Sequence, residues 1–309
     1  MAILAVVGIC CCLAAAAAAV MGLLSVVPIQ GNTTDLGERT WRHYEVGESP
    51  VLTLDSFSGR VSVRAVEGGA IEVVAQKQAQ REGDLERIKI DISRTKDGLA
   101  IKTEKAPGVG SASVDFEITA PAGTRLDART GSGSMRIDGI LGGVQAHSGS
   151  GSLVVAGAGG GVEARTGSGS IEVRDSGGGT IIESGSGSLR IRDVEGEVQA
   201  STGSGSIEAL GIRGPVRLDS GSGSIEYAGW PQGDSRFQTG SGGITLVLPA
   251  ELDIAVDLLS VSGQVEVGHE LSGPATVSRG EVKGVVGTGE DGSIWARTGS
   301  GNIRLVKER

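Results

Sequence analysis

The segment Thr166–Ile171 reads Thr-Gly-Ser-Gly-Ser-Ile, and the same pattern returns along the chain at a fixed interval. Each copy consists of Ser or Thr, then Gly-Ser-Gly-Ser, then an aliphatic residue. Successive copies are 18 residues apart, and they end on Met135, Leu153, Ile171, Leu189, Ile207 and Ile225. A fixed period of this length predicts a solenoid, in which each repeat buries its apolar face against its neighbours.

Apolar residues also recur halfway through each repeat. A second series, nine residues after the first, contains Val144, Val162, Thr180, Val198 and Val216. A further and mostly apolar residue stands two positions beyond each member of both series, as at Val173 and Ala164. This alternation predicts strands with one buried face, so each coil contains two short strands and two corners.

The Gly-Ser-Gly step forms one of the two corners. We expect its glycines to adopt backbone angles with φ > 0, which glycine allows at no steric cost. The Ser or Thr before the step shares the parity of the inward residues, so stacking predicts a column of hydroxyls that hydrogen-bond to one another between coils. A flexible Gly/Ser linker is excluded, because linkers do not carry two aliphatic columns in register.

The predicted fold class is an all-β parallel β-solenoid with 18-residue two-strand coils, preceded by an N-terminal transmembrane helix. About ten coils, each adding ~4.8 Å, give a length of roughly 50 Å. The left-handed hexapeptide helix of many acyltransferases also has 18-residue coils. It needs an aliphatic residue at every sixth position, and Gly159 and Arg165 break that series between Leu153 and Ile171.

The net charge and the cysteine positions limit which binding partners and which stabilising bonds the chain can have. The chain has 309 residues, 53 of them glycine, and a net charge of −9, with no basic stripe of the kind that binds nucleic acid. Its three cysteines, Cys10–Cys12, all lie in the N-terminal apolar segment, so the remainder has no disulfide or thiol chemistry. We therefore expect no nucleic-acid partner and a body stabilised by stacking alone.

Residues 1–30 are predicted to form a transmembrane anchor or a signal segment. No charged side chain occurs from Met1 to Ile29, and residues 3–27 are long enough to span a bilayer as a helix. A cleaved signal peptide is the alternative, since Ala14–Ala19 offers small residues for cleavage. Both interpretations predict that the body leaves the cytoplasm, tethered through the polar residues 31–40 or secreted after cleavage.

Two β-rich regions follow the tether. Residues 41–120 show strand patterns without the period, and we interpret them as an irregular leading part that caps the solenoid; a separate small sandwich is the alternative. Residues 121–309 carry the solenoid repeats, whose rhythm is interrupted at Trp230-Pro231. The charged end, Lys307–Arg309, is expected to protect the last exposed edge strand.

The repeats do not match a known metal-binding or catalytic pattern. Calcium-binding β-rolls share the nine-residue half-period, but their ligand Asp is replaced here by Arg136, Val154, Glu172, Arg190, Glu208 and Glu226. A polysaccharide-cleaving β-helix would draw its acids from residues such as Asp175 and Asp193. Charges of alternating sign on neighbouring strands, as at Glu172, Arg190 and Glu208, are ordinary support for a sheet.

Histidine and aromatic residues are few. His43, His147 and His269 lie far apart in the sequence, have no metal-ligand spacing and are expected at the surface. Tyr227, Trp230 and Phe237 lie where the rhythm breaks; they are expected to fill the core there, with a sugar-stacking patch as the alternative. We predict no catalytic, cofactor-binding or metal-binding residue and no cofactor.

Three motifs resemble one protein family. Ser56–Val63 resembles its opening strand, Phe116–Gly123 its strand ending in Pro-Ala-Gly, and the Thr-Gly-Ser-Gly-Ser-Ile coils follow. Over residues 46–306 the chain is similar to the bacterial adhesin-like β-solenoid family, a domain of unknown function. The resemblance implies an envelope-associated location and supplies no catalytic residues to transfer.

The leading functional hypothesis is a non-enzymatic, membrane-tethered, extracytoplasmic adhesin-like module for adhesion or cell-envelope interaction. Its expected partners are the membrane, through the N-terminal helix, and cell-surface polymers or envelope proteins, at the cell surface or in the periplasm. An extracytoplasmic sensor or scaffold in envelope-stress signalling is the alternative. A carbohydrate-active enzyme is the least favoured, and no small-molecule substrate is identified.

Overall fold

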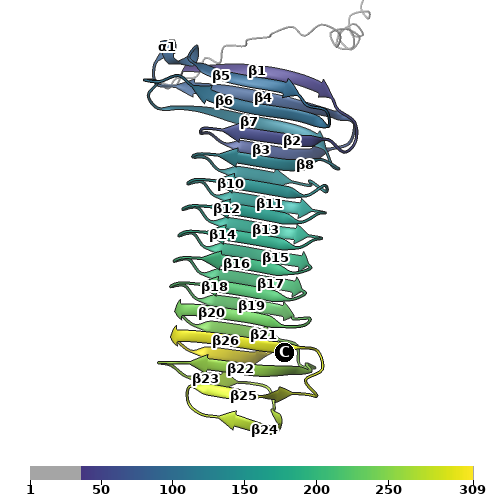
Figure 1. The fold of residues 1–309 in the computed structure, drawn as a ribbon, viewed down its shortest axis with the longest axis vertical. Helices are drawn as coiled ribbons and strands as arrows, with labels where there is room; N and C mark the ends of the chain where they lie inside the picture. The colour runs from purple at the N-terminus through teal and green to yellow at the C-terminus, as the bar shows by residue number, and fades with distance from the viewer. Residues whose placement is uncertain (1–35, 309) are drawn as a thin grey trace, which may run out of the picture.

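The computed structural model describes residues 36–308, which form two long sheets stacked as a solenoid (Figure 1). Sheet A has 13 strands and sheet B has 14, and the one helix in this range, α1 (Glu82–Leu85), has four residues. No helix between residues 36 and 308 combines the length and apolar character needed to cross a bilayer. The predicted anchor or signal segment at 1–30 lies outside the described residues.

The regular coils alternate between the two sheets. In sheet B they contribute β8 (Arg125–Thr130), β10 (Val144–Ser148), β12 (Val162–Thr166), β14 (Thr180–Ser184), β16 (Val198–Thr202) and β18 (Val216–Ser220). In sheet A they contribute β9 (Met135–Asp138), β11 (Leu153–Ala158), β13 (Ile171–Ser176), β15 (Leu189–Glu195), β17 (Ile207–Arg213) and β19 (Ile225–Trp230).

Neighbouring coils pair in parallel and without stagger. Leu153 lies opposite Ile171 in sheet A, and Val144 lies opposite Val162 in sheet B, each pair 18 residues apart. The prediction of an all-β parallel solenoid of two-strand coils is therefore confirmed. Both aliphatic columns are buried, with Ile171 and Val173 on one side of the core and Val162 on the other.

The hydroxyl column is buried as predicted, but its hydrogen bonds differ from the prediction. The hydroxyl of Thr166 donates to the carbonyl of Gly151 in the preceding coil at 2.8 Å and accepts from the amide of Gly169 at 3.2 Å. Ser148, Ser184, Thr202 and Ser220 form the equivalent pairs of bonds. The hydroxyls therefore satisfy backbone groups of glycine, and they do not bond to one another down the column.

The reason for glycine at this corner also differs from the prediction. Neither Gly151 nor Gly169 has a positive φ. A Cβ on Gly169 would overlap the carbonyl oxygen of Gly151, and a Cβ on Gly151 would overlap that of Gly133. Glycine is required because the backbones of successive coils come closer together here than a side chain allows.

The N-terminal end departs from the order of the sequence. Its strands are β1 (Leu36–Glu45), β2 (Val51–Ser56), β3 (Val61–Val66), β4 (Ala70–Ala79), β5 (Ile88–Arg94), β6 (Gly98–Lys105) and β7 (Ala112–Pro121). The β2/β3 coil lies between the β6/β7 coil, which follows it in sequence, and the β8/β9 coil. Antiparallel strands β1, β4 and β5 then cover this end, so residues 41–120 share both sheets with the repeats.

At the C-terminal end, too, the two outermost coils stack in the reverse of their sequence order, which we call a coil exchange (Figure 1). Its strands are β20 (Ser235–Ser241), β21 (Ile244–Leu248), β22 (Ile254–Ser260), β23 (Val265–Val267), β24 (Ser272–Val277), β25 (Glu281–Val286), β26 (Ser293–Ser300) and β27 (Ile303–Lys307). The last coil, β26/β27, lies between the β20/β21 and β22/β23 coils. The expectation that Lys307–Arg309 protects an exposed edge is wrong, because β27 is paired on both sides and the edge strands are β23 and β24.

Eleven coils stack in this way within residues 36–308, close to the predicted number. At ~4.8 Å per step their stack is roughly 50 Å long.

Replacing a corner glycine should destabilise the stack. Gly169→Ala forces a methyl group into the Gly151 carbonyl of the preceding coil, and we expect a loss of about 2–3 kcal/mol in unfolding free energy. Gly83→Ala is the matched control, since Gly83 lies in the exposed turn of α1 with open space where the new methyl group would stand, and it should be neutral or slightly stabilising. Equal denaturation midpoints for the two variants, followed by circular dichroism, would contradict this account of the corner.

Candidate functional site

Asp175 and Asp193 occupy a special backbone position. They are the two non-glycine residues with positive φ between residues 36 and 308, at 55° and 52°. Neighbouring coils place Gly139, Gly157 and Gly211 in the same column, also with positive φ. Asp tolerates the left-handed region better than most residues do. Both aspartates therefore have a conformational reason to be there, and as catalytic candidates they have no further support.

The charged column of sheet A forms the expected cross-strand ion pairs. Arg190 lies 3.9 Å from Glu172 and 3.1 Å from Glu208, and Arg192 lies 2.8 Å from Glu208. The hydrogen bond from Arg192, followed by that from Arg190, lowers the pKa of Glu208 although partial burial opposes the shift. The hydrogen bond to Glu208 also raises the pKa of Arg192.

The three histidines lie in different environments. His43 lies on the outer face of β1, 3.0 Å from Glu45 and 3.4 Å from Glu72, and the hydrogen bond to Glu45 raises its pKa. His147 lies on the outer face of sheet B. The expectation of a surface position is wrong for His269, which is buried and donates from Nε2 to the carbonyl of Pro249 at 3.0 Å. No group of three or more His, Cys, Asp or Glu in residues 36–308 is arranged to hold a metal ion.

The aromatic residues of the irregular coil separate into two environments. Tyr227 and Phe237 are fully buried with ring centroids 5.1 Å apart, so the prediction that they fill the core is confirmed. Burial also raises the pKa of the Tyr227 hydroxyl. Trp230 instead remains 44% exposed at the end of β19, an interior strand of sheet A.

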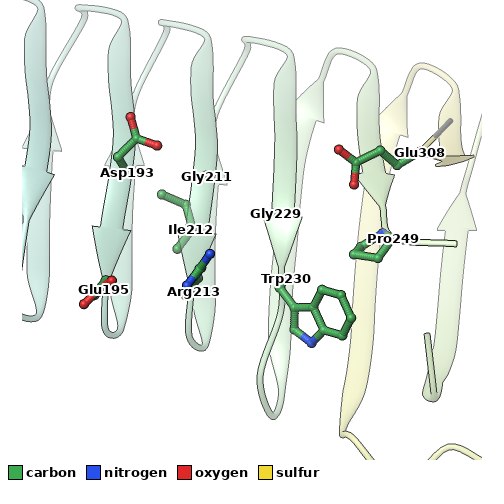
Figure 2. Close-up of a pocket in the computed structure, with 9 residues that line it drawn as sticks. All are labelled: Asp193, Glu195, Gly211, Ile212, Arg213, Gly229, Trp230, Pro249 and Glu308. Atoms are coloured by element: carbon green, nitrogen blue, oxygen red, sulfur yellow. The ribbon is translucent and has the colours of Figure 1, made fainter. Parts of the chain in front are cut away.

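Trp230 borders an open pocket of about 400 Å³, which we call the Trp230 pocket (Figure 2). Its volume lies in the range of small-ligand sites. The lining residues come from β15, β17, β19 and the segments that follow β21 and β27: Asp193, Glu195, Gly211, Ile212, Arg213, Gly229, Trp230, Pro249 and Glu308.

The pocket forms at the coil whose sheet A strand lacks the extra residue with positive φ that the preceding coils contain. Strands β15 and β17 each contain an extra residue with positive φ, Asp193 and Gly211, whereas β19 contains none. The register between β17 and β19 shifts at this point, so that Trp230 lies opposite Arg213. Arg213 in turn lies opposite Glu195, and Figure 2 shows the three side chains in a row across neighbouring strands.

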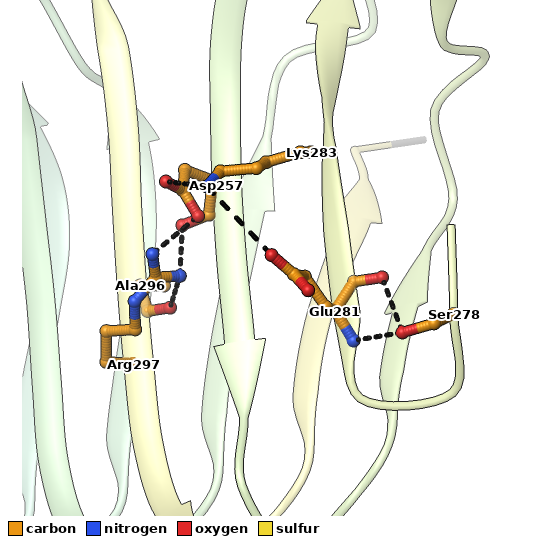
Figure 3. Close-up of polar contacts among 6 residues, drawn as sticks. All are labelled: Asp257, Ser278, Glu281, Lys283, Ala296 and Arg297. Atoms are coloured by element: carbon orange, nitrogen blue, oxygen red, sulfur yellow. Dashed lines mark hydrogen bonds and ion pairs between the residues drawn. The ribbon is translucent and has the colours of Figure 1, made fainter. Parts of the chain in front are cut away.

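A second polar cluster lies at the C-terminal end (Figure 3). Asp257 of β22 is 2.6 Å from Arg297 of β26 and 3.3 Å from Lys283 of β25. Arg297 and Arg236 both stack on the ring of Trp295, at 4.8 Å and 4.1 Å. These charged groups largely pair with one another and join the β26/β27 coil to its neighbours. We therefore assign the cluster a structural role.

Residues 51–306 match the family model described as Toastrack DUF4097. The chain belongs to the Toastrack DUF4097 family. The predicted resemblance to an adhesin-like solenoid family of unknown function is confirmed by this match. No curated protein matches this Toastrack chain.

Solved structures similar to the Toastrack chain include a "putative adhesin" from Bacteroides fragilis, with 14% identity and a TM-score of 0.41 over 87% of this chain and 97% of that one. A "putative cell adhesion protein" from Clostridium sporogenes has 10% identity and a TM-score of 0.29, covering 88% of this chain and 100% of that one. A "putative adhesin" from Parabacteroides merdae has 13% identity and a TM-score of 0.24, covering 68% and 92%. The family assignment rests on the family model.

The sequence analysis singled out Trp230 and Asp193 but missed Glu195 and Arg213, which line the same pocket. Glu195 and Arg213 are 18 residues apart, whereas Arg213 and Trp230 are 17 apart. That shortened step is the sequence signal that brings the three residues into one row. Glu308 joins the pocket through the C-terminal exchange of coils, which the sequence period does not reveal.

The lowered pKa of Glu208 predicts a pH-dependent contribution to stability. The unfolded carboxyl, with an ordinary pKa near 4.5, binds protons more readily than the folded one, so the ion pairs stabilise the fold above that value. Their contribution is lost as pH falls through the folded pKa. Glu208→Gln should therefore lower the denaturation midpoint slightly at pH 7, and this difference from the parent should shrink as pH falls below about 4.5. A difference that persists undiminished at pH 3 would contradict this assignment.

Proposed function

We propose that the chain is a non-enzymatic, extracytoplasmic adhesin-like module, tethered to a membrane, that contacts other cells or the cell envelope. The observation that carries the proposal is the pair of long, regular outer faces. Each coil repeats the same outward positions, as in the series Glu172, Arg190 and Glu208 on sheet A. A regular array of this kind suits many weak contacts with an extended partner, because linked contacts reinforce one another.

The membrane tether is proposed from the sequence. Residues 1–29 carry no charged side chain and are long enough for one membrane-spanning helix. The first described strand, β1, begins at Leu36, so a short polar segment would join the helix to the N-terminal end of the solenoid. This arrangement presents the stack of coils away from the membrane surface.

The location of the body can be tested on living cells. The full chain, produced in a Gram-negative bacterium with a C-terminal epitope, is exposed to protease on intact cells and after permeabilisation of the outer envelope. Cleavage on intact cells supports adhesion. Cleavage only after permeabilisation favours the periplasmic sensor or scaffold, which would further require residues 1–30. Protection in both conditions, with cleavage only after full lysis, would contradict an extracytoplasmic body.

A further inference from the structure

The Trp230 pocket has the features of a binding site. Glu195, Arg213 and Trp230 lie on three adjacent parallel strands, so their backbones are spaced at steps of ~4.8 Å along the solenoid axis. Strands hold side chains more precisely than loops do. Pro231 is buried directly after Trp230 and restricts the backbone next to the indole. The backbone positions of the three residues are therefore fixed relative to one another.

The polar groups of this row are available to a ligand. Elsewhere on the outer face of sheet A, Arg190 and Arg192 form ion pairs with Glu208. Within residues 36–308, by contrast, no ion pair or hydrogen bond occupies the side chains of Glu195, Arg213 or Trp230. An exposed indole face, a five-donor guanidinium and an acceptor carboxylate thus stand side by side without internal partners.

This combination matches a sugar ring. A pyranose has an apolar C–H face that can lie on an indole, and its hydroxyl groups both donate and accept hydrogen bonds. Glu195 would accept from one hydroxyl and Arg213 would donate to another. Asp193 and Glu308 also line the pocket, so three carboxylates surround one guanidinium and disfavour an anionic sugar.

We propose that the Trp230 pocket is a subsite for one pyranose unit of an uncharged glycan, with the ring stacked on Trp230 and its hydroxyls bonded by Arg213 and Glu195. The pocket is open and lies across the ends of the neighbouring strands β15, β17 and β19, so a longer glycan would extend out of it over neighbouring coils. This proposal rests on the proposed function, because it specifies the envelope polymer that the module contacts.

The tryptophans provide a direct measurement. The chain has three, so its indole N–H groups give three ¹⁵N–¹H signals, assigned by Trp→Phe variants. The full chain, in a zwitterionic detergent without a sugar headgroup, is titrated with tetrasaccharides of glucose, mannose, galactose or N-acetylglucosamine. At least one of these should shift the Trp230 signal and leave those of Trp41 and Trp295 in place, whereas tetragalacturonate should shift none. No Trp230 shift with any of the four, or an equal shift at Trp41, would overturn the subsite.

Matched variants test the assigned roles. Trp230→Ala and Arg213→Ala should each weaken binding of the active tetrasaccharide at least tenfold. Trp41→Ala is the control, since Trp41 is 49% exposed on the same sheet but outside the pocket, and it should change the affinity less than twofold. Far-UV circular dichroism verifies that each variant is folded. Equal effects of Trp230→Ala and Trp41→Ala would contradict the site.

Co-sedimentation with purified bacterial envelopes separates this proposal from the broader function. If the parent chain and Trp230→Ala sediment equally, the adhesion proposal stands and the subsite fails. If tetrasaccharides shift Trp230 but the parent chain does not sediment, the subsite stands and the adhesion proposal fails.

Discussion

The close approach of successive backbones at the Gly-Ser-Gly corner is the constraint on which the rest of the structure depends. There is no room for a Cβ between the second glycine of one coil and the carbonyl of the coil before it. The buried hydroxyl of Ser or Thr fixes the same contact, because it bonds both to that carbonyl and to the amide of its own corner. Leaving either buried backbone group unpaired would cost about 1–3 kcal/mol.

The corner specifies stacking without regard to the order of the coils in the sequence. Thr298, in the last coil, donates to Gly242 at 2.8 Å although 56 residues separate them. Ser260 donates to Gly301 at 2.6 Å in the same manner. Coils can therefore stack out of sequence order: at the C-terminal end a later coil lies between two earlier ones, and at the N-terminal end the first coil lies between two later ones. The exchange leaves short or irregular strands at the C-terminal edge, which limits the surface available for edge-to-edge association.

The repeat itself was predictable because in-register stacking requires like residues at a fixed spacing in the sequence. Residues such as Leu153 and Ile171 are both periodic in sequence and paired in space, so their burial followed directly. The role of the corner glycines was not predictable, since a conformational requirement and a close approach both select glycine. The coil exchange, the burial of His269 and the contribution of Glu308 to the pocket depend on long-range pairings that leave no local signal. The pocket arises where the period fails, at the 17-residue step from Arg213 to Trp230.

Cysteine cross-linking tests most directly whether the corner, and not the chain order, determines the stack. Thr245 lies opposite Arg304, and Arg304 lies opposite Glu266, so β27 separates Thr245 from Glu266. With Cys10–Cys12 replaced by Ser, the pair Thr245→Cys and Arg304→Cys should form a disulfide under mild oxidation, because adjacent strands bring the Cα atoms within the required distance of about 4.4–6.8 Å. The pair Thr245→Cys and Glu266→Cys should not. A disulfide in the second pair and none in the first would show that the coils stack in sequence order and would contradict the account.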